Sequence, residues 1–409
     1  GVIAEEPSPL AAIGRGLGGI INGRPFDRKV AIPPGRDSDS NVDDWGVSGE
    51  IVRDFGGAEL TSITAYRVND LTRGQDADFN NLDILYRDSG GGSGNKFNTF
   101  TQELRLQGEA LGGKLDWLVG GYFANEKLRV KDNLSYGDDY SRYANCLVAN
   151  NFASAVGQPG LVSTANPTCF NPAVAGAVFA SPFFPAAQRP VLAAFAGLNL
   201  TPFGGPNFGA APFTNSGFVN LGIANGVPGL SFGGRTADRY EQTSNNWAIF
   251  THNIFSITDA LDLTVGLRYT TERKKLNMAL ADSGSLCGFY SAVPPLNALQ
   301  QIPCVIPSVP GGSFSDSGKR SERKLSGTGV LSYKLFDNVL TYASYSRGYK
   351  AGGFNLDRAA LARVGGNGAV LPTASVDNLE FKPETNDAME LGLKYNGRGL
   401  DINVAAFHQ

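Results

Sequence analysis

The chain has 409 residues, a formal net charge of −3 and a mean hydropathy of −0.14. A bundle of membrane-spanning helices would be far more apolar, and no run of about 18 apolar residues free of helix breakers occurs. The slightly acidic balance offers no basic face for nucleic acid, so we expect no nucleic-acid partner.

The first 43 residues contain a glycine motif but not the surroundings that would give it a function. Gly1 to Leu10 lacks the basic start and apolar core of a signal peptide. Gly14 to Gly19 fits the spacing G-x-G-x-x-G, but Asn22 and Pro25 argue against the helix that a dinucleotide site needs after its glycines. We therefore expect residues 1–43 to be a flexible extracellular loop segment without a cofactor.

From Asp44 onward the sequence repeats one plan, in which an alternating strand, a very short turn and a second alternating strand are followed by a long polar or Gly-rich stretch. Apolar and polar residues alternate with period two, as in a strand with two different faces. The ten predicted strands are 45–55, 58–76, 98–109, 115–131, 243–257, 261–280, 321–335, 339–354, 385–396 and 400–409.

Short connections on one side and long ones on the other are typical of an outer-membrane β-barrel. The predicted strands also exceed the mean of about 5–6 residues in soluble sheets, whereas a membrane crossing needs about 9–11. Aromatics near the short turns suit an interfacial girdle, although they could also be core residues of a β-sandwich. These aromatics are Phe55, Trp117, Phe255, Phe336 and Tyr395.

We therefore predict an all-β fold, a transmembrane antiparallel β-barrel over residues 44–409. The last predicted strand stops at Gln409 within its alternating pattern, so we expect about ten strands of a larger barrel. The short turns should face the periplasm and the long connections the outside. The periplasmic markers are Gly56, Gly112, Asp259, Asn338 and Gly397, and the external markers are Gly91, Arg189, Ser285 and Gly365.

Two connections are especially long, 132–242 and 281–320. Between Ala144 and Gly234 the single charged residue is Arg189, yet this segment holds 11 of the 25 Phe and 10 of the 22 Pro. Such a composition does not favour disorder, so we expect a compact, irregular cap over the barrel mouth. Packing on itself and contact with a ligand or a surface partner both remain open. The candidate contact residues are Tyr140, Tyr143, Phe183, Phe184 and Arg189, with support of the rim as the alternative role for the two tyrosines.

Two further sets of residues carry predictions about bonding. The cysteines fall into two near pairs without metal-ligand or redox spacing, which predicts the disulfides Cys146–Cys169 and Cys287–Cys304 in an oxidising compartment. Six charged residues on the polar side of the strands should face the lumen, where cross-strand ion pairs and plug contacts are favoured over substrate binding. They are Glu103, Arg105, Arg268, Glu272, Glu390 and Lys394.

The sequence indicates neither a metal site nor a catalytic site. His252 and His408 have no second His or Cys at ligand spacing, so we expect no metal. No G-x-S-x-G elbow or triad setting occurs, so we expect no enzyme.

Several strings resemble strands of TonB-dependent outer-membrane receptors: TFTQELRL with LDWLVGGYF, LDLTVGLRYTTE, YASYSRGYKAGGFN and FKPETNDAMELGLK. The resemblance implies a 22-stranded barrel in the outer membrane of a Gram-negative bacterium, plugged by an N-terminal domain and driven by the TonB complex. It also implies import of a scarce nutrient such as a siderophore, vitamin or glycan. This chain has no plug and no recognisable TonB-contacting segment, so the TonB contact would be made through a missing plug. A passive porin and a structural or adhesive surface protein are the alternatives.

Overall fold

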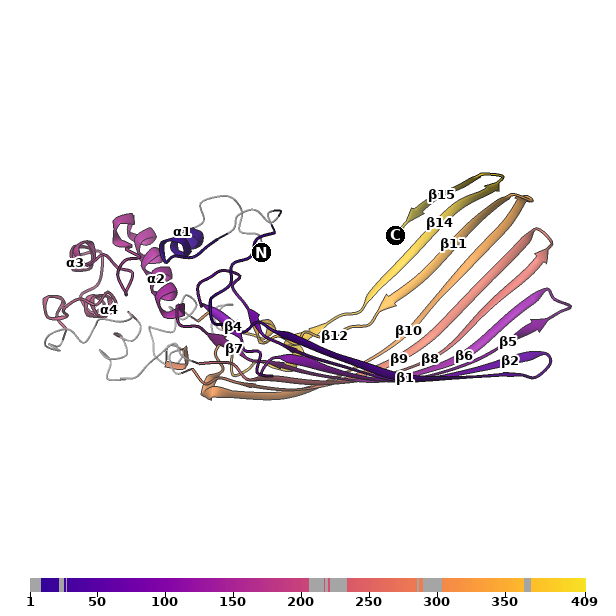
Figure 1. The fold of residues 1–409 in the computed structure, drawn as a ribbon, viewed down its shortest axis with the longest axis horizontal. Helices are drawn as coiled ribbons and strands as arrows, with labels where there is room; N and C mark the ends of the chain where they lie inside the picture. Colours follow the sequence, from indigo (N-terminus) through magenta and orange to yellow (C-terminus); the bar gives the residue numbers. More distant parts are fainter. Residues whose placement is uncertain are drawn as a thin grey trace.

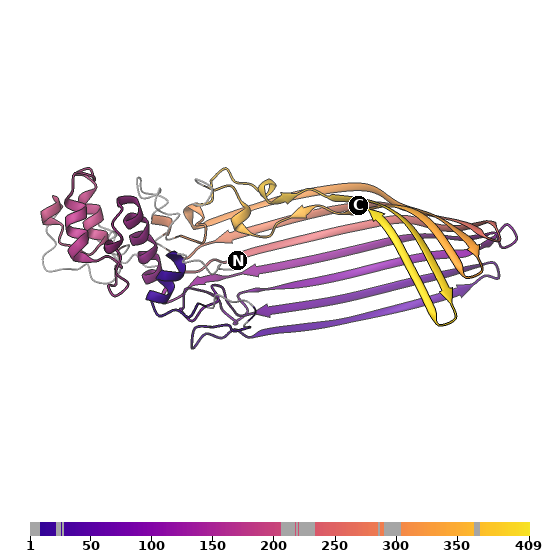
Figure 2. The same cartoon turned by 90° about the horizontal axis from the view of Figure 1, so that it is seen from above.

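The computed structural model describes residues 9–21, 26, 28–205, 217, 220, 234–284, 287–289, 304–363 and 369–409. Ten long strands form one antiparallel sheet that curves into an open trough (Figures 1 and 2). Each of them falls on a predicted strand, so the predicted sheet is confirmed. The strands, in sheet order, are β1 (Ser40–Asp54), β2 (Ala58–Arg73), β5 (Gly94–Ala110), β6 (Leu115–Asp132), β8 (Asp238–Thr258), β9 (Leu261–Ala281), β10 (Ser313–Phe336), β11 (Val339–Lys350), β14 (Glu384–Gly397) and β15 (Leu400–His408).

All five predicted short turns occur, and they gather at one end of the sheet (Figure 1). In the β1–β2 turn, Phe55 N donates to Ala58 O at 2.9 Å, and Gly56 N donates to the Asp54 carboxylate at 2.6 Å. Gly56 has φ +81°, a conformation that a side chain would strain. The long connections gather at the opposite end, so the predicted asymmetry is confirmed. Gly91 and Arg189 lie at this long-loop end, while Ser285 and Gly365 fall outside the described residues.

Two predicted strands end earlier than expected. The strand predicted over 58–76 stops at Arg73, and β3 (Gln75–Asp76) joins a small sheet with β4 (Leu85–Arg87) and β7 (Leu134–Tyr136). Gly74 separates β2 from β3, where a Cβ would come within 2.5 Å of the Asp37 carbonyl. The strand predicted over 339–354 likewise stops at Lys350, and β12 (Gly353–Phe354) pairs with β13 (Glu380–Phe381).

The two faces of the sheet differ in polarity. The convex face carries a continuous set of apolar side chains that no other part of the described chain covers, and Leu391 on β14 is 65% exposed. Such a broad exposed apolar surface would be a liability in water but is expected against lipid. Other apolar residues exposed on this face are Val47, Leu104, Val119, Ile249, Leu267 and Leu331.

A helical unit lies beyond the long-loop end of the sheet, and we call its described part, residues 140–205, the cap (Figure 1). The segment was predicted to be irregular, and that prediction is wrong. Its described residues form three helices, with one short 3-10 turn, η2 (Pro159–Leu161), between the first two and another, η3 (Thr201–Phe203), after the last. The helices are α2 (Tyr140–Val156), α3 (Pro172–Ala180) and α4 (Arg189–Phe195).

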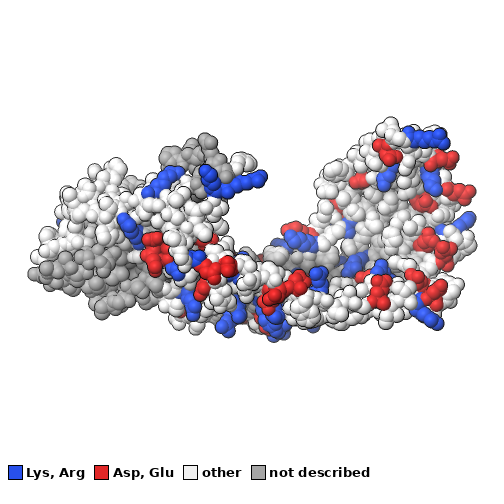
Figure 3. Space-filling model, in the orientation of Figure 1, with Lys and Arg blue, Asp and Glu red and all other residues white. Residues whose placement is uncertain are grey.

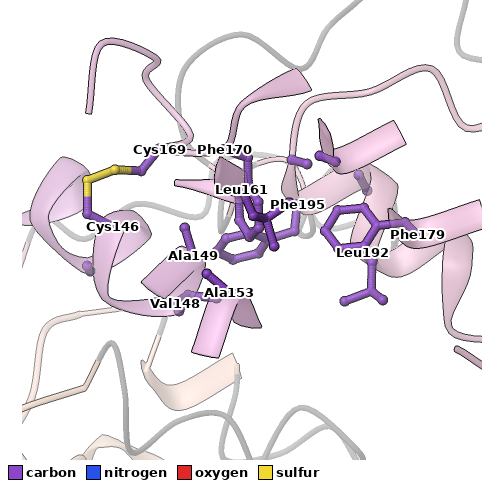
Figure 4. Close-up of a cluster of buried hydrophobic side chains, with 14 of the residues drawn as sticks. Cys146, Val148, Ala149, Ala153, Leu161, Cys169, Phe170, Phe179, Leu192 and Phe195 are labelled. Atoms are coloured by element: carbon purple, nitrogen blue, oxygen red, sulfur yellow. A yellow bond between two sulfur atoms is a disulfide. The ribbon is translucent and has the colours of Figure 1, made fainter. Parts of the chain in front are cut away.

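The cap has its own hydrophobic core (Figure 4). Phe170 lies at its centre, with ring centroids 5.7 Å from Phe179 and from Phe195 and 6.2 Å from Phe152. Several buried side chains on α2 are small, among them Ala144, Ala149 and Ala153, so neighbouring segments can approach closely there. Self-packing therefore accounts for much of the apolar surface of the described cap.

The glycine motif near the start ends a helix instead of preceding one. Helix α1 (Pro9–Gly16) corrects the prediction that this segment is only a flexible loop. Gly19 N donates to Gly14 O at 2.8 Å and Gly18 N donates to Arg15 O at 3.0 Å, with Gly18 at φ +94°. This is a Schellman cap, which uses the backbone donors that a phosphate would need. No helix in the described part of the chain has both the length and the apolar character needed to cross a membrane.

Both expected disulfides, Cys146–Cys169 and Cys287–Cys304, are present in the structure. The first joins α2 to the residue before the central Phe170 (Figure 4). The second lies beside β7, where the Tyr136 hydroxyl is 3.8 Å from Cys287 Sγ and accepts a hydrogen bond from Ile306 N at 3.4 Å.

Opening the first disulfide should weaken the cap. The double change Cys146→Ser and Cys169→Ser frees a separation of 23 residues, and a closure of this size is worth about 3 kcal/mol. Hydrogen exchange of α2 and α3 should quicken by a factor that matches this loss, whereas exchange in β8 and β9 should not change. A non-reduced digest that yields crossed cysteine pairs or free thiols would contradict the assignment.

Candidate functional site: the concave face and its cover

All six charged residues predicted to face the lumen share one face of the sheet. The strand register places Glu103 and Arg105 of β5 on the same face as Arg268 and Glu272 of β9. Through β10 and β11 the same face reaches Glu390 and Lys394 of β14. It is the concave face, the side toward which β14 and β15 curl (Figures 1 and 2).

Of the six predicted residues, Glu103 and Glu272 form ion pairs along their own strands, not across strands as predicted. Elsewhere on this face, Arg67 pairs with Asp44 and Lys350 with Glu384 across neighbouring strands. Arg105 Nε lies 2.9 Å from a Glu103 carboxylate oxygen, although its geometry does not make a full hydrogen bond. Opposite Glu103 stand Ile63 and Tyr122, and opposite Arg105 stand Thr61 and Gly120, so no charged cross-strand partner is available. Residues i and i+2 of a strand point to the same face, so Glu103 and Arg105 can pair with each other along β5.

A second group of charges shows the same arrangement on two adjacent strands. On β9, Lys274 Nζ is 2.9 Å from Glu272. On β10, Arg320 Nε is 2.6 Å from Glu322. The register sets Glu272 opposite Glu322 and Lys274 opposite Arg320. Like charges face each other across the strands, so the pairing within each strand offsets that repulsion.

The remaining predicted lumen residues contact aromatic rings. The Arg268 guanidinium lies 5.3 Å from the ring centroid of Tyr122 and 5.5 Å from that of Phe250, a cation–π geometry. On β14, Glu390 accepts a hydrogen bond from the Tyr342 hydroxyl, and Lys394 Nζ is 5.5 Å from the same ring. The wall is therefore lined by charges that already have partners.

The described parts of the connection between β11 and β14, residues 351–363 and 369–383, fold back over the concave face at the long-loop end. Its side chains Phe354, Val376 and Leu379 pack in one buried cluster with Leu276 and Met278 of β9. Its backbone is held by the charges below it, because Lys274 Nζ donates to Gly352 O at 2.7 Å and Gly352 N donates to Glu322 at 3.2 Å. This cover, which we call the inner loop, closes part of the trough.

Arg358 fixes the inner loop in place. Its side chain is 5% exposed and bonds both carboxylate oxygens of Asp238, where Nε donates at 2.7 Å. It also bonds Asp282 and donates to Pro307 O at 2.9 Å and to Ala281 O at 3.1 Å. Burial opposes the charged form, but the hydrogen bonds and ion pairs with Asp238 and Asp282 outweigh it and raise the pKa of Arg358. Sequence patterns did not single out Arg358.

The five candidate contact residues of the cap fall into different environments. Tyr140 is fully buried, and its hydroxyl accepts a hydrogen bond from Val305 N at 3.5 Å, so a role in direct contact is corrected to one in the core. Phe184 is also buried, and Tyr143 packs against the core. Arg189 Nε donates to Phe184 O at 3.0 Å. Phe183, at 67%, is the exposed member of the set. Figure 3 shows that the described surface of this unit is largely uncharged.

The two histidines do not come together. His252 lies on β8 opposite Leu118 and Gly266, in a cleft of about 590 Å³ near the short turns that Glu59 and Trp117 also line. His408 is on β15, opposite Met389.

An open sheet with an exposed apolar convex face, a charged concave face and an inner loop across it has the design of a transmembrane β-barrel wall. The sequence profile of the family described as TonB dependent receptor-like, beta-barrel matches residues 33–409. The chain belongs to this family.

Individual relatives are distant. The pesticin receptor of Yersinia enterocolitica is 28% identical over 101 residues, which is 25% of this chain and 13% of that protein. The ferric yersiniabactin uptake receptor FyuA from Yersinia pestis has a TM-score of 0.48 at 15% identity, covering 93% of this chain and 38% of the receptor. The siderophore receptor PiuA from Acinetobacter baumannii has a TM-score of 0.44 at 12% identity, covering 92% and 43%. The chain thus spans less than half the length of these proteins.

Proposed function

We propose that the chain is the barrel part of an outer-membrane receptor of a Gram-negative bacterium that imports a scarce nutrient. Membership of the TonB-dependent receptor family supports this function. Energy would come from the TonB complex through a plug domain, the convex face would contact lipid, and residues 44–409 would form part of a 22-stranded barrel. The nutrient would be a siderophore, vitamin, glycan or similar solute. A surface partner, if one binds, would bind the segment 144–234, whose single charged residue is Arg189.

The sidedness follows from the same proposal. In an outer-membrane barrel the short turns lie in the periplasm and the long connections lie outside. Gly56 and Asn338 would then be periplasmic, while the cap, the 282–312 connection and the inner loop would face the medium. Residues 1–43 would also be external, with α1 packed near α2.

The observation that carries the proposal is the docked inner loop. Phe354 and Leu379 bury against β9, and Arg358 locks the loop to β8, so the entrance is narrowed by a built structure. A receptor that selects one solute needs such a shaped entrance. A passive porin needs an open lumen, so the docked inner loop favours the receptor. The porin and the surface adhesin are tested as the alternative outcomes of the experiment below.

Removing the cap should abolish nutrient uptake while leaving the barrel folded. The two ends of the segment are adjacent, since Tyr136 N donates to Gly234 O at 3.2 Å, so a short Gly-Ser linker can replace residues 138–233 of the full-length protein. Uptake of labelled ferric siderophores, cobalamin and oligosaccharides would be measured in cells with and without an active TonB complex. The intact protein should import one of these classes only when TonB is active, and the deletion should lose that uptake but remain heat-modifiable on gels.

The alternatives give different results. TonB-independent uptake together with a steady ion conductance in planar bilayers would identify a porin. Neither uptake nor conductance, with cell-surface partner capture that the deletion removes, would identify an adhesin. Phe183→Ala, a single change on the exposed surface of the cap, is the control for expression and surface delivery.

A further inference from the structure

The loop between β3 and β4, residues 77–84, places oxygen-bearing side chains at alternate positions. The sequence Asp76, Ala77, Asp78, Phe79, Asn80 puts two carboxylates and an amide at the first, third and fifth places of the run. Asp76 is 6% exposed, and Asp78 beside it is half-buried. The loop lies at the long-loop end, beyond the strands of the main sheet.

Asp76 has a carboxylate oxygen without a donor. Its Oδ1 accepts a hydrogen bond from Asp78 N at 3.2 Å, while its Oδ2 is buried and has no hydrogen-bond partner. A buried charged oxygen without a partner is costly, so an unfilled position of this kind points to a missing positive group. The neighbouring carboxylate does not supply one.

We propose that this loop binds one calcium ion. Asp76 Oδ2 and the Asp78 carboxylate would be the charged ligands, with the Asn80 amide oxygen and loop carbonyls completing the shell. The described residues hold no group of three or more His, Cys, Asp and Glu side chains suited to a metal, so an ion here must accept neutral oxygens. Calcium does so with six to eight oxygen ligands in flexible geometry, whereas zinc prefers His and Cys, and magnesium demands a stricter octahedron.

The spacing fits the first half of a calcium loop. Ligands at positions 1, 3 and 5 match the start of the twelve-residue calcium loop. Position 6 is Asn81 where that loop has glycine, and position 12 is Arg87 where it has a bidentate glutamate. The site therefore lacks one strong ligand, and its affinity should fall in the range of extracellular modules, a Kd of about 10⁻⁴ to 10⁻³ M.

The Asn80 side chain must turn for this role. Its Nδ2 donates to Asp78 Oδ1 at 2.6 Å and its Oδ1 accepts from Leu82 N at 2.7 Å. Turning the amide would present Oδ1 beside Asp78, where the ion replaces the lost donor. Leu85 N, which donates to Asp78 Oδ2 at 2.7 Å, can keep its bond because a carboxylate accepts several partners.

The ion would join the cap to the sheet. The same loop contributes Leu82 and Ile84 to the core of the cap. Asp83 N donates to Asp139 at 3.0 Å, just before α2 begins, and Asn81 Nδ2 donates to Gly18 O at 3.2 Å after α1. Ordering of residues 77–84 by calcium should therefore tighten the attachment of both helices.

Calorimetric titration of the calcium-free, full-length protein in detergent with CaCl2 tests the proposal. The double variant Asp76→Asn and Asp78→Asn should bind one calcium fewer per chain, or bind it about 100-fold more weakly. Asp88→Asn is the matched control, because Asp88 is exposed and accepts Gly90 N at 3.1 Å in a turn near the same loop. It should bind as the wild type does, and MgCl2 at equal concentration should not displace calcium.

A second readout does not depend on folding of the variants. In the wild type, calcium should slow hydrogen exchange at the amides of residues 78–85 and at the start of α2, and EDTA should reverse the effect. Equal calcium stoichiometry and affinity in the wild type and the double variant, or no calcium-dependent change in exchange at 78–85, would overturn the proposal.

Discussion

Replacing Arg358 with methionine should release the inner loop from the concave face. The change leaves Asp238, which is 5% exposed, as a buried carboxylate without its cation. Removal of one partner from a buried ion pair costs about 3–5 kcal/mol, roughly a hundredfold or more in the opening equilibrium. Amide hydrogen exchange should quicken by that factor at two backbone donors of the inner loop. Asn355 N donates to Leu379 O at 2.7 Å, and Val370 N donates to Ser308 O at 2.9 Å.

Arg347→Met provides the matched control. Arg347 Nε lies 3.3 Å from Asp387, but the two side chains are 54% and 46% exposed, so their pair is worth about 1 kcal/mol or less. Its removal should leave exchange in the inner loop unchanged. Equal protection of Asn355 in the Arg358 variant and the wild type would show that the apolar cluster alone holds the loop.

The change Phe170→Ala should unfold the cap locally and leave the sheet intact. Phe170 is 1% exposed and meets three other phenylalanine rings, so truncation creates a cavity at the centre of the core. Such a change costs about 3–5 kcal/mol. Thermolysin should then cleave within residues 140–205 at a much higher rate, while heat-modifiability of the barrel on gels stays the same.

Phe183→Ala removes an equally large ring from the exposed surface of the same unit, where a change of about 0.5 kcal/mol or less is expected. Matched cleavage rates for the Phe170 and Phe183 variants would mean that the aromatic cluster does not stabilise the cap.

The sheet could be predicted from the sequence because the membrane-facing strands alternate strictly. Leu263, Val265 and Leu267 interleave with polar residues, and both the strand and its two faces follow from that pattern. The pattern stops where both faces become polar. β10 was predicted from 321 but begins at Ser313. Apart from Phe314, the residues before Ser321 are polar or glycine on both faces, and this part of the strand is paired with β9 only.

The cap was predicted to be ordered, but its helices were missed. The prediction rested on the spacing of phenylalanine, whereas α2 has no buried phenylalanine. Its buried positions are three alanines with Tyr140, Asn145, Cys146 and Val148. Those residues recur at helical spacing, but alanine gives a weak apolar signal. The ten prolines of the segment favoured an irregular structure, yet Pro172 and Pro190 each stand in the first turn of a helix, where the missing N–H is harmless.

The contacts that shape the entrance could not be predicted. Arg358 meets Asp238 across 120 residues of sequence, and no local pattern marks either residue. The direction of the ion pairs was also beyond the sequence, since only the register shows that Glu103 stands opposite Ile63 and Tyr122. By contrast, the alternate spacing of Asp76, Asp78 and Asn80 can be read directly from the sequence.

The order of the strands determines how such a wall can assemble. Most neighbours in the sheet are joined by a turn of a few residues, so these hairpins close quickly. β6 and β8 are different, because Asn125 bonds Asn245 across 120 residues. Closing a flexible loop of that size costs about 4 kcal/mol of chain entropy. The hydrogen bond between Tyr136 N and Gly234 O holds the two ends of this connection together, so once it forms, little of that chain entropy is left to lose when β6 pairs with β8. The base of the long connection is thus as much a part of the β6–β8 pairing as the ladder itself.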